Sequence, residues 1–395
     1  MPFPQTTIVM SRLEFVSLAN QPGANVRQLC RNFGISPTTG YKWLRRYELE
    51  YEGGLQDRSR RPHHSPNRTD LEVEDAVMKL HRRYPYWSGR KLQKLLPEPL
   101  HRPAPSTIAK IITRNGSSVL RDHQPQGPYK RFERKRPNSL WQMDFKGDFA
   151  LSRGGRCYPL SVIDDHSRYC IALEAVGSTK TQGTQSALQA CFQRYGLPEA
   201  ILADNGNPWG CANSDCRYTT LGVWLLRIGV DLIHGQPYHP QTQGKCERLN
   251  RTIQLELLNR SLAWKDLGHC QKHFQQWRHQ YNHIRPHEAL DMRPPATRYR
   301  HSPRPMPSSI SPIQYDHGDS VRTVKRKGEI TFKNHFFYIG RAFSGLQVAL
   351  RPTTKESVYD LFFSWKRLGR IDLSKVEKPK YRYNHFIPQA NQSSD

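Results

Sequence analysis

The sequence predicts a multidomain chain with two small all-α modules, a middle α/β domain and a small terminal β-barrel. Apolar residues at helical spacing, with helix-capping residues between them, occur twice within the first 115 residues. From residue 138 short strand patterns alternate with helical ones, and residues 313–374 hold only short strand patterns between glycine or charged turns. With 395 residues the chain is long enough for two or three domains, each with its own core.

Composition excludes several classes of protein. The longest apolar runs, such as residues 221–226, fall far below the roughly 18 residues that span a bilayer. The N-terminus lacks the basic start and apolar stretch of a secretory signal, so we expect a cytoplasmic protein without membrane contact. The eight cysteines show no repeated spacing, which argues against a disulfide framework and for reduced thiols.

The formal net charge of +26 predicts a polyanionic partner, because such an excess otherwise repels itself. Nucleic acid is the first candidate. The net charge is +13 in residues 1–137, +5 in residues 138–300 and +8 in residues 301–395. The basic excess therefore lies mainly at the two ends of the chain.

Residues 1–56 are predicted to form a helix-turn-helix domain. Apolar residues recur at i, i+3, i+4 and i+7, which places them on one face of a helix; they are Val26, Leu29, Cys30 and Phe33. Gly34 supplies the short turn, Ser36 is a typical N-cap, and Pro37 stands at the first helical position, where its missing N–H costs nothing.

The second of these helices presents a surface that suits a DNA major groove. Its inward face is Gly40, Trp43, Leu44 and Tyr47, and its outward face is Thr38, Thr39, Lys42, Arg45 and Arg46. A three-helix bundle with a merely solvated outer face is the alternative interpretation.

A basic segment, residues 57–68, is predicted to be a linker that lies along phosphates through Arg58, Arg60 and Arg61. Residues 69–118 repeat the helical plan, with apolar stripes at Val73, Ala76, Val77 and Leu80, at Leu92, Leu95 and Leu96, and at Ile108, Ile111 and Ile112 after a predicted Ser106 cap. This region is either a second helix-turn-helix-like domain or a helical dimerisation module. Residues 119–137 are predicted to be a second basic linker.

Residues 138–300 are predicted to form the α/β domain. Its strands are residues 140–150, 157–164, 168–176, 200–203 and 231–234, and its helices are residues 184–195, 221–226 and a helix from residue 244. Residues 301–312 carry four prolines and four serines, which predicts a stiff, solvated connector. The barrel is expected over residues 313–380, with strands at 321–324, 330–332, 336–339, 348–350 and 359–363, before a tail at 381–395.

Three carboxylates stand where a sheet brings its strands together. Asp144 lies in the middle of a strand, Asp204 ends an apolar strand, and Glu247 sits in a helix opened by Gly244. A mid-strand Asp is disfavoured and costly to bury unpaired, and a bound cation offsets that cost. Mg²⁺, or Mn²⁺, prefers such oxygen ligands, and two ions can activate a nucleophile and stabilise the leaving oxygen of a phosphodiester. Spacing alone does not separate this site from three unrelated acids.

The sequence around these carboxylates carries a resemblance. The three blocks are Trp141-Gln142-Met143-Asp144-Phe145, Leu202-Ala203-Asp204-Asn205-Gly206, and the run from Pro237 to Arg248 that contains Gln241-Thr242-Gln243-Gly244-Lys245-Cys246-Glu247. They resemble the signature blocks of retroviral-integrase-like DDE transposases of bacterial insertion sequences. Tyr281-Asn282 with Arg285-Pro286-His287 is similar to that family's downstream motif.

This resemblance implies a ribonuclease-H-like core over residues 138–300 that holds Mg²⁺ with Asp144, Asp204 and Glu247. It further implies a DNA transposase that cuts the ends of the transposon and joins the freed 3′-OH to target DNA. The 42 residues between Asp204 and Glu247 exceed the classical integrase interval, and we expect the extra length near residues 208–220, beside the active site. The N-terminal zinc module of retroviral integrases is not found.

Three other clusters compete as metal sites. The run Asp164-Asp165-His166-Ser167-Arg168 is interpreted as a strand-to-strand turn, because neighbouring strand residues face opposite ways. Cys211 and Cys216 lack the second pair of ligands that structural zinc needs. The histidines between residues 269 and 287 fall largely on a helix predicted over residues 264–281, whose polar face is expected to be solvated or to lie on DNA.

Lys245, Arg248 and Arg251 share the helix of Glu247 and are predicted to contact the phosphate backbone, with surface solubility as the alternative. Overall we expect a Mg²⁺-dependent transposase that acts on double-stranded DNA, at end repeats and target, as a homo-oligomer associated with the nucleoid. A structure-selective nuclease with the same carboxylates is the first alternative. A DNA-binding regulator without catalysis is the second, but it would show a substituted carboxylate, and all three are intact.

Overall fold

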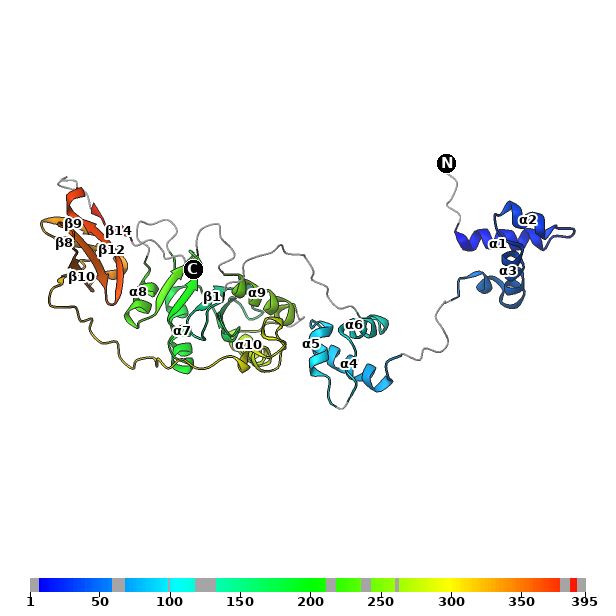
Figure 1. Ribbon diagram of the computed structural model, residues 1–395, viewed down its shortest axis with the longest axis horizontal. Coiled ribbons are helices and arrows are strands. Elements are labelled where there is room, and N and C mark those ends of the chain that lie inside the picture. The colour runs from blue at the N-terminus through cyan, green and yellow to red at the C-terminus, as the bar shows by residue number, and fades with distance from the viewer. Residues whose placement is uncertain are drawn as a thin grey trace. The chain divides into compact units, whose positions relative to one another are not determined.

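A computed structural model of the chain describes residues 7–58, 68–98, 100–117, 133–210, 218–235, 243–259, 263–376 and 384–388 (Figure 1). The chain divides into two compact units, Met1–Thr69 and Asp70–Asp395. No helix within the described ranges is long and apolar enough to cross a membrane. The cysteines in these ranges are free thiols, as expected.

The first unit confirms the predicted helix-turn-helix arrangement. Its helices are α1 (Ile8–Ala19), α2 (Val26–Asn32) and α3 (Pro37–Glu50), followed by a 3₁₀ turn (Tyr51–Leu55). Ser36 caps α3, and its hydroxyl accepts a hydrogen bond of 3.2 Å from the Thr39 N–H. The core consists of Phe15, Val16, Cys30, Trp43 and Leu55.

Gly40 allows α3 to approach the other two helices closely. A Cβ atom at this position would lie 2.4 Å from Cys30 Sγ and 2.9 Å from the Phe15 ring. Both neighbours are buried and belong to the core, so neither can move aside cheaply. The packing of this small unit therefore requires glycine at residue 40.

The second helical module consists of α4 (Leu71–Arg83), α5 (Gly89–Leu95) and α6 (Pro105–Arg114) around a core that includes Val77, Trp87, Leu92 and Ile111. The predicted Ser106 cap is wrong. Ala104 occupies the N-cap of α6 and Pro105 its first turn, because the ring of Pro105 presets the helical φ angle one residue earlier.

The α/β domain is built on one sheet of β1 (Trp141–Phe145), β2 (Phe149–Ala150), β3 (Arg156–Asp164), β4 (Cys170–Val176), β5 (Ala200–Ala203) and β6 (Asp231–His234). The order is β2-β3-β1-β5-β6, with β4 on β3. Strand β1 pairs antiparallel with β3 and parallel with β5. The single strand predicted at residues 140–150 is broken, because Gly147 turns the chain at φ +77°.

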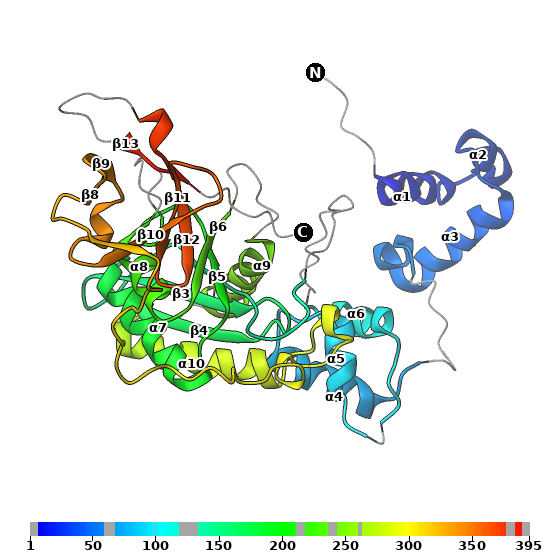
Figure 2. The ribbon, with the colours of Figure 1, turned by 60° about the vertical axis from the view of Figure 1, so that its left-hand side comes forward.

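Helices cover both faces of this sheet (Figures 1 and 2). One buried cluster joins Trp141, Met143 and Ile201 to α7 (Thr181–Tyr195) and α8 (Thr220–Arg227). A second joins Ile163 and Leu173 to α9 (Gly244–Ile253), the π turn at Gln254–Leu258, and α10 (Leu267–His283). The sheet is thus the middle of three layers, in agreement with the expected integrase-type core.

The connector at residues 301–312 has no regular structure and most of its residues are exposed, as predicted, but it is also attached to the α/β domain. The Ser302 N–H donates to Tyr195 O at 2.8 Å, and the Leu197 N–H donates to Arg304 O at 2.7 Å. Met306 and Ile310 pack against the core of the α/β domain. The apolar residues between the prolines hold this segment to the domain.

The terminal β region forms two sheets rather than one closed barrel among the described strands, so the predicted barrel is not confirmed. The larger sheet has the order β14-β12-β11-β10-β7 and the smaller one β13-β9-β8. The bounds are β7 (Ser320–Thr323), β8 (Glu329–Phe332), β9 (His335–Tyr338), β10 (Gln347–Pro352), β11 (Val358–Phe363), β12 (Lys366–Asp372), β13 (Asn384–His385) and β14 (Ile387–Pro388). Sequence patterns missed β12 because it is rich in basic residues.

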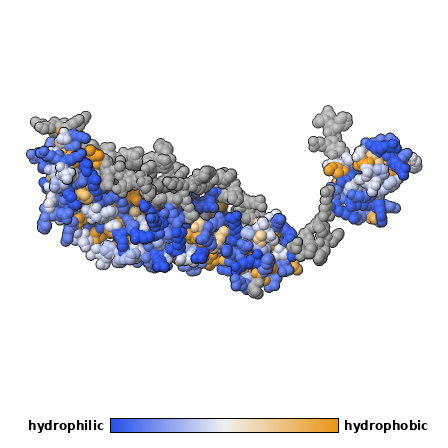
Figure 3. Space-filling model, viewed as in Figure 1, coloured by the Kyte–Doolittle hydropathy of each residue, from blue (hydrophilic) through white to orange (hydrophobic). Residues whose placement is uncertain are grey.

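The β region and the α/β domain share a packed boundary at α8. Val223 and Leu226 of α8 belong to the apolar cluster of the β region, and the Trp365 indole N–H donates to Leu226 O at 3.0 Å. Hydrophilic residues predominate on the face of the molecule that Figure 3 shows, with only small apolar patches between them.

We expect Gly40→Ala to destabilise the first unit by about 1–3 kcal/mol, because the added methyl overpacks a filled core. Hydrogen exchange of peptides from residues 8–55 in the full-length protein measures this change. Gly53→Ala is the matched control, since a Cβ there meets nothing within 4 Å. Equal effects of the two substitutions would contradict the packing argument.

Candidate active site

Strand β1 presents two polar side chains to α9. Trp141 and Met143 enter the core with α7 and α8, so the alternation of the strand turns Gln142 and Asp144 to the opposite face. Asn250 Nδ2 donates to Asp144 Oδ2 at 2.9 Å, and the Cys246 N–H donates to Gln142 Oε1 at 3.1 Å. The predicted mid-strand position of Asp144 is confirmed.

Asp204 follows β5 directly, next to β1 in the sheet. Its carboxylate accepts a hydrogen bond of 3.0 Å from the Gly206 N–H and another from the Trp209 indole. Trp209 is buried and stacks on Phe145 with 5.1 Å between ring centroids. The described start of the extra segment therefore lies beside Asp204, whereas Cys211 and Cys216 lie outside the described residues.

Glu247 stands exposed in the first turn of α9, on the helix that the sequence predicted. The helix is docked through its buried face, where Ser161 Oγ donates to Asn250 Oδ1 at 2.7 Å and Cys246 is buried. Since Asn250 also holds Asp144, the same hydrogen-bond chain joins β3, α9 and β1.

The three carboxylates interact electrostatically. Burial, followed by the negative charges of Asp204 and Glu247, raises the pKa of Asp144 to about 6, while hydrogen bonds from the Asn250 amide and the Phe145 backbone oppose this rise. Within the described residues no three His, Cys, Asp or Glu side chains form a ready metal-binding group. The oxygen donors and their mutual repulsion nevertheless fit a hard divalent cation, which would relieve that repulsion.

The DNA-contact residues predicted on α3 differ in exposure. Thr38, Lys42 and Arg45 are exposed, and Thr39 is half-buried beside the Ser36 cap. Arg46 is also half-buried, with its guanidinium 5.1 Å from the centroid of the Trp43 ring. Sequence patterns did not single out Arg12 of α1. Its guanidinium lies 3.9 Å from the centroid of the same Trp43 ring and donates a hydrogen bond of 2.7 Å to Leu55 O.

The structure describes only some of the other residues that were predicted to contact DNA. Arg58 forms an ion pair with Glu50, and Arg60 and Arg61 lie outside the described residues. Arg248 and Arg251 are exposed on α9.

Lys245 has a protein partner, because its ammonium forms an ion pair with the buried Asp165. Burial, together with nearby Arg168, lowers the pKa of Lys245 to about 8.

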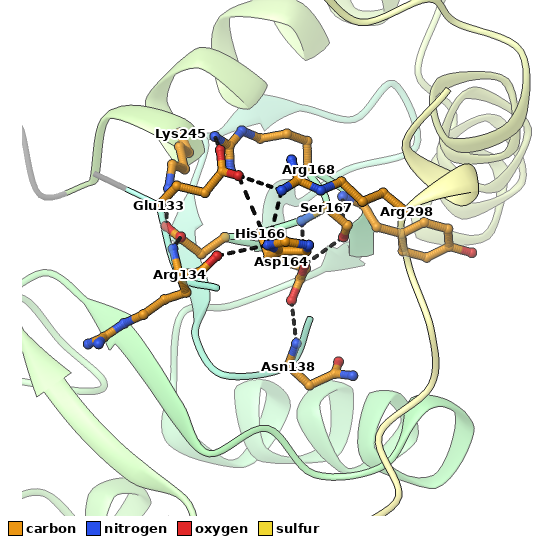
Figure 4. Close-up of polar contacts among 11 residues, drawn as sticks. Glu133, Arg134, Asn138, Asp164, His166, Ser167, Arg168, Lys245 and Arg298 are labelled. Carbon is orange, nitrogen blue, oxygen red and sulfur yellow. Dashed lines mark hydrogen bonds and ion pairs between the residues drawn. The ribbon is translucent and has the colours of Figure 1, made fainter. Parts of the chain in front are cut away.

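A turn at residues 165–167 directly follows β3, which ends at Asp164, so the turn predicted for this segment is confirmed (Figure 4). Asp164 accepts hydrogen bonds of 2.7 Å from the Asn138 and Ser167 N–H groups. Sequence reasoning missed Glu133, which pairs with Arg168 at 2.6 Å and Arg298 at 2.8 Å. No local pattern signals this cluster, because its members come from distant segments of the chain.

The histidine-rich helix is confirmed as α10, from Leu267 to His283. His269 and His273 contact the Trp264 ring, and none of these histidines joins a metal-binding group within the described ranges. Burial, followed by the charge of Arg285, lowers the pKa of His287 to about 3, so this side chain is neutral.

Comparison with known families finds three kinds of domain in the chain. Residues 134–240 and 228–295 match two family descriptions of an integrase core domain. Residues 319–379 match the IS481 family transposase C-terminal domain. Residues 11–63 match a helix-turn-helix domain and residues 39–112 a homeodomain-like domain.

Similar proteins include viral and insertion-element products. The chain is 31% identical over 137 residues to the Gag-Pol polyprotein of Feline leukemia virus, covering 34% of this chain and 8% of that one. It is 30% identical over 167 residues to an insertion element IS476 protein of Xanthomonas euvesicatoria, covering 40% and 44%. An insertion element IS407 protein of Burkholderia multivorans is 28% identical over 193 residues, covering 48% and 66%. The chain thus spans less than two thirds of the length of each of these relatives.

Two solved structures are also similar. The simian T-cell lymphotropic virus intasome is 16% identical with a TM-score of 0.36, covering 74% of this chain and 97% of that chain. The HTLV-2 integrase catalytic core domain in complex with magnesium is 14% identical with a TM-score of 0.32, covering 42% and 99%.

We expect Asp144→Asn to stabilise the metal-free protein at pH 8 by on the order of 1–2 kcal/mol, after allowance for solvent screening. The raised pKa of Asp144 means that its ionised form costs stability above about pH 6. This cost disappears as the pH falls from 6 to 4, so the advantage of Asn should disappear over the same range. Denaturant unfolding in chelating buffer at several pH values tests this, and an advantage independent of pH would contradict it.

The order of the matched domains agrees with the order of the folded regions. The helix-turn-helix match covers the first unit, the integrase core matches cover the α/β domain, and the C-terminal match covers the terminal β region. The chain therefore contains an integrase core domain between helix-turn-helix domains and an IS481-type transposase C-terminal domain.

Proposed function

We propose that this chain is a DNA transposase that binds transposon end repeats, cleaves the end phosphodiester with an activated water and joins the 3′-OH to target DNA. The observation that carries the proposal is that β1, which bears Asp144, pairs with β5, which ends directly before Asp204, and that Asn250 of the helix that bears Glu247 donates to Asp144. These three carboxylates come from separate elements, and they occupy the positions that the sequence blocks single out. The integrase core match and the insertion-element relatives support the same function.

In this proposal Asp144, Asp204 and Glu247 hold Mg²⁺, or Mn²⁺, most simply as two ions. The bound metal would supply Lewis-acid activation of the attacking water or 3′-OH and stabilise the leaving oxygen. Asn250 orients Asp144 through its 2.9 Å hydrogen bond. The indole of Trp209 and the Gly206 N–H orient Asp204 at the edge of the site.

In this proposal the two units contact different parts of the DNA. Thr38, Thr39, Lys42, Arg45 and Arg46 of α3 read the transposon end, and Arg58, Arg60 and Arg61 follow the backbone. Arg248 and Arg251 on α9 hold phosphates beside the carboxylates, whereas Lys245 is occupied with Asp165. We further propose that the chain works on double-stranded DNA as a homo-oligomer, in the cytoplasm at the nucleoid.

We expect Asp144→Asn, Asp204→Asn and Glu247→Gln each to abolish cleavage and joining while end binding stays within a few-fold. An amide keeps the shape of the side chain but removes the charge that holds the cation. The measurement is cleavage, joining and gel shift on a labelled transposon end with Mg²⁺ or Mn²⁺, repeated with a chelator.

Asp148→Asn is the matched control for these variants, because Asp148 pairs with Arg156 on the surface. Full activity of any of the three carboxylate variants would remove that residue from the site. Activity that survives exhaustive chelation would overturn the metal mechanism. Cleavage without joining of the 3′-OH would indicate a nuclease instead.

We expect Arg45→Ala to reduce discrimination between end and scrambled DNA by about 1–3 kcal/mol, because base-edge contacts carry sequence information. Replacing Arg58, Arg60 and Arg61 by Gln should weaken binding to both duplexes equally. The same change should flatten the salt dependence by about one unit for each phosphate that is no longer neutralised. A salt-titrated affinity series on both duplexes tests this. Equal affinity of the unmodified protein for the two duplexes at every salt concentration would place specificity elsewhere.

A further inference from the structure

The N-terminus of α9 is held by a side chain of strand β1 rather than by a capping residue of its own. The first N–H groups of a helix have no partner within the helix. Gln243 at the N-cap makes no side-chain capping bond. Instead the Cys246 N–H donates to Oε1 of Gln142 on β1 at 3.1 Å. Gln142 is buried, so this contact replaces a local cap.

Asp165 fixes the orientation of that glutamine. Its Oδ1 accepts a hydrogen bond of 3.0 Å from Gln142 Nε2, which turns the amide oxygen of Gln142 toward α9. The same Oδ1 accepts from the ammonium of Lys245, the residue before Cys246. One carboxylate oxygen therefore contacts α9 twice, directly through Lys245 and indirectly through Gln142.

Asp165 is itself rigidly placed. It is fully buried, and its Oδ2 accepts a hydrogen bond of 2.7 Å from the Arg134 N–H. Its own N–H donates to Leu140 O at 2.9 Å, just before β1. A buried carboxylate with three donors is satisfied within the protein, so it needs no substrate or cation to offset its burial.

This arrangement acts on the spacing between two proposed metal ligands. Asp144 lies two residues after Gln142 on the same face of β1, and Glu247 is the next residue after Cys246. Farther along the helix, Asn250 binds Asp144. Two attachment points, at Cys246 and at Asn250, fix the rotation of α9 about its axis.

We propose that Asp165 is a positioning residue that sets how α9 presents Glu247 to Asp144. The role of Glu247 in this statement rests on the proposed function. The attachment of α9 by Asp165 rests on the contacts alone. The effect of Asp165 on the site passes through Gln142 and Lys245.

The experiment compares Asp165→Asn with Asp164→Asn in the full-length protein. Asp164 is the matched control because it lies in the same turn and is equally buried, but it binds Asn138 and Ser167 instead of α9. Hydrogen exchange of peptides covering residues 244–250 is measured without DNA or metal. Joining of a pre-cut end is measured against Mn²⁺ and DNA concentration.

We expect Asp165→Asn to speed exchange in residues 244–250 by roughly tenfold, the size of the effect of removing one hydrogen bond to a charged group. The half-saturating Mn²⁺ concentration should rise, and kcat should fall, with KM for the DNA end unchanged. Asp164→Asn should leave the exchange rate, the half-saturating Mn²⁺ concentration, kcat and KM unchanged in the folded protein. Unaltered exchange and Mn²⁺ dependence in Asp165→Asn would overturn the proposal.

Asp165→Asn alone can fail to fold, because it removes the charged partner of the Lys245 ammonium. The test then uses Lys245→Gln and the double variant Asp165→Asn/Lys245→Gln, which removes both charges of this ion pair. Groups that act through one another are not additive, so the double variant should be no worse than the more affected single variant. Fully additive effects would overturn the coupling. If the unmodified protein joins no DNA but Asp165→Asn still releases α9, the proposed function fails while the attachment of α9 by Asp165 stands.

Discussion

The central strand β1 has apolar side chains on one face and polar side chains on the other. The helices on each side of the sheet pack according to these two faces. Trp141 and Met143 of β1 fill an apolar core, while Gln142 and Asp144 turn toward α9 on the other side. Burying polar side chains is costly unless each one is hydrogen-bonded. The α9 layer supplies the donors, from the Cys246 backbone and the Asn250 side chain. Docking of α9 and formation of the candidate site are therefore the same event, because a shift of α9 would leave a polar group of β1 unpaired.

Segments outside the sheet complete this arrangement. Trp209 fills space against Phe145 while its indole binds Asp204, so one residue of the extra segment both packs the edge of the sheet and orients a carboxylate. Glu133 joins Arg168 to Arg298 and thereby ties the start of the domain to its end. Connectors that look like linkers by composition thus stabilise the domain wherever apolar or charged side chains find partners in it.

The net charge differs between the regions of the chain. The α/β domain carries the smallest basic excess, +5, and in it burial, followed by the charges of Asp204 and Glu247, raises the pKa of Asp144. The first 137 residues carry +13, and in the first unit part of that charge lies against the Trp43 ring, where Arg12, Lys42 and Arg46 gather. Aromatic stacking holds these cations in place at the surface of the first unit, which favours an ordered basic face.

Local features of the fold could be predicted from the sequence: the helix starts at Ser36 and Gly244, the strands around Asp144 and Asp204, and the turn at residues 164–168. Each follows from residues within a few positions of one another, which caps, periodicity and turn chemistry describe. Other features required the folded chain, namely the pairing of Lys245 with Asp165, the packing of Met306 and Ile310 on the core, and the division of the terminal strands into two sheets. These contacts join residues tens of positions apart, and their free energy comes from burial and ion pairing that exist only after the chain has folded.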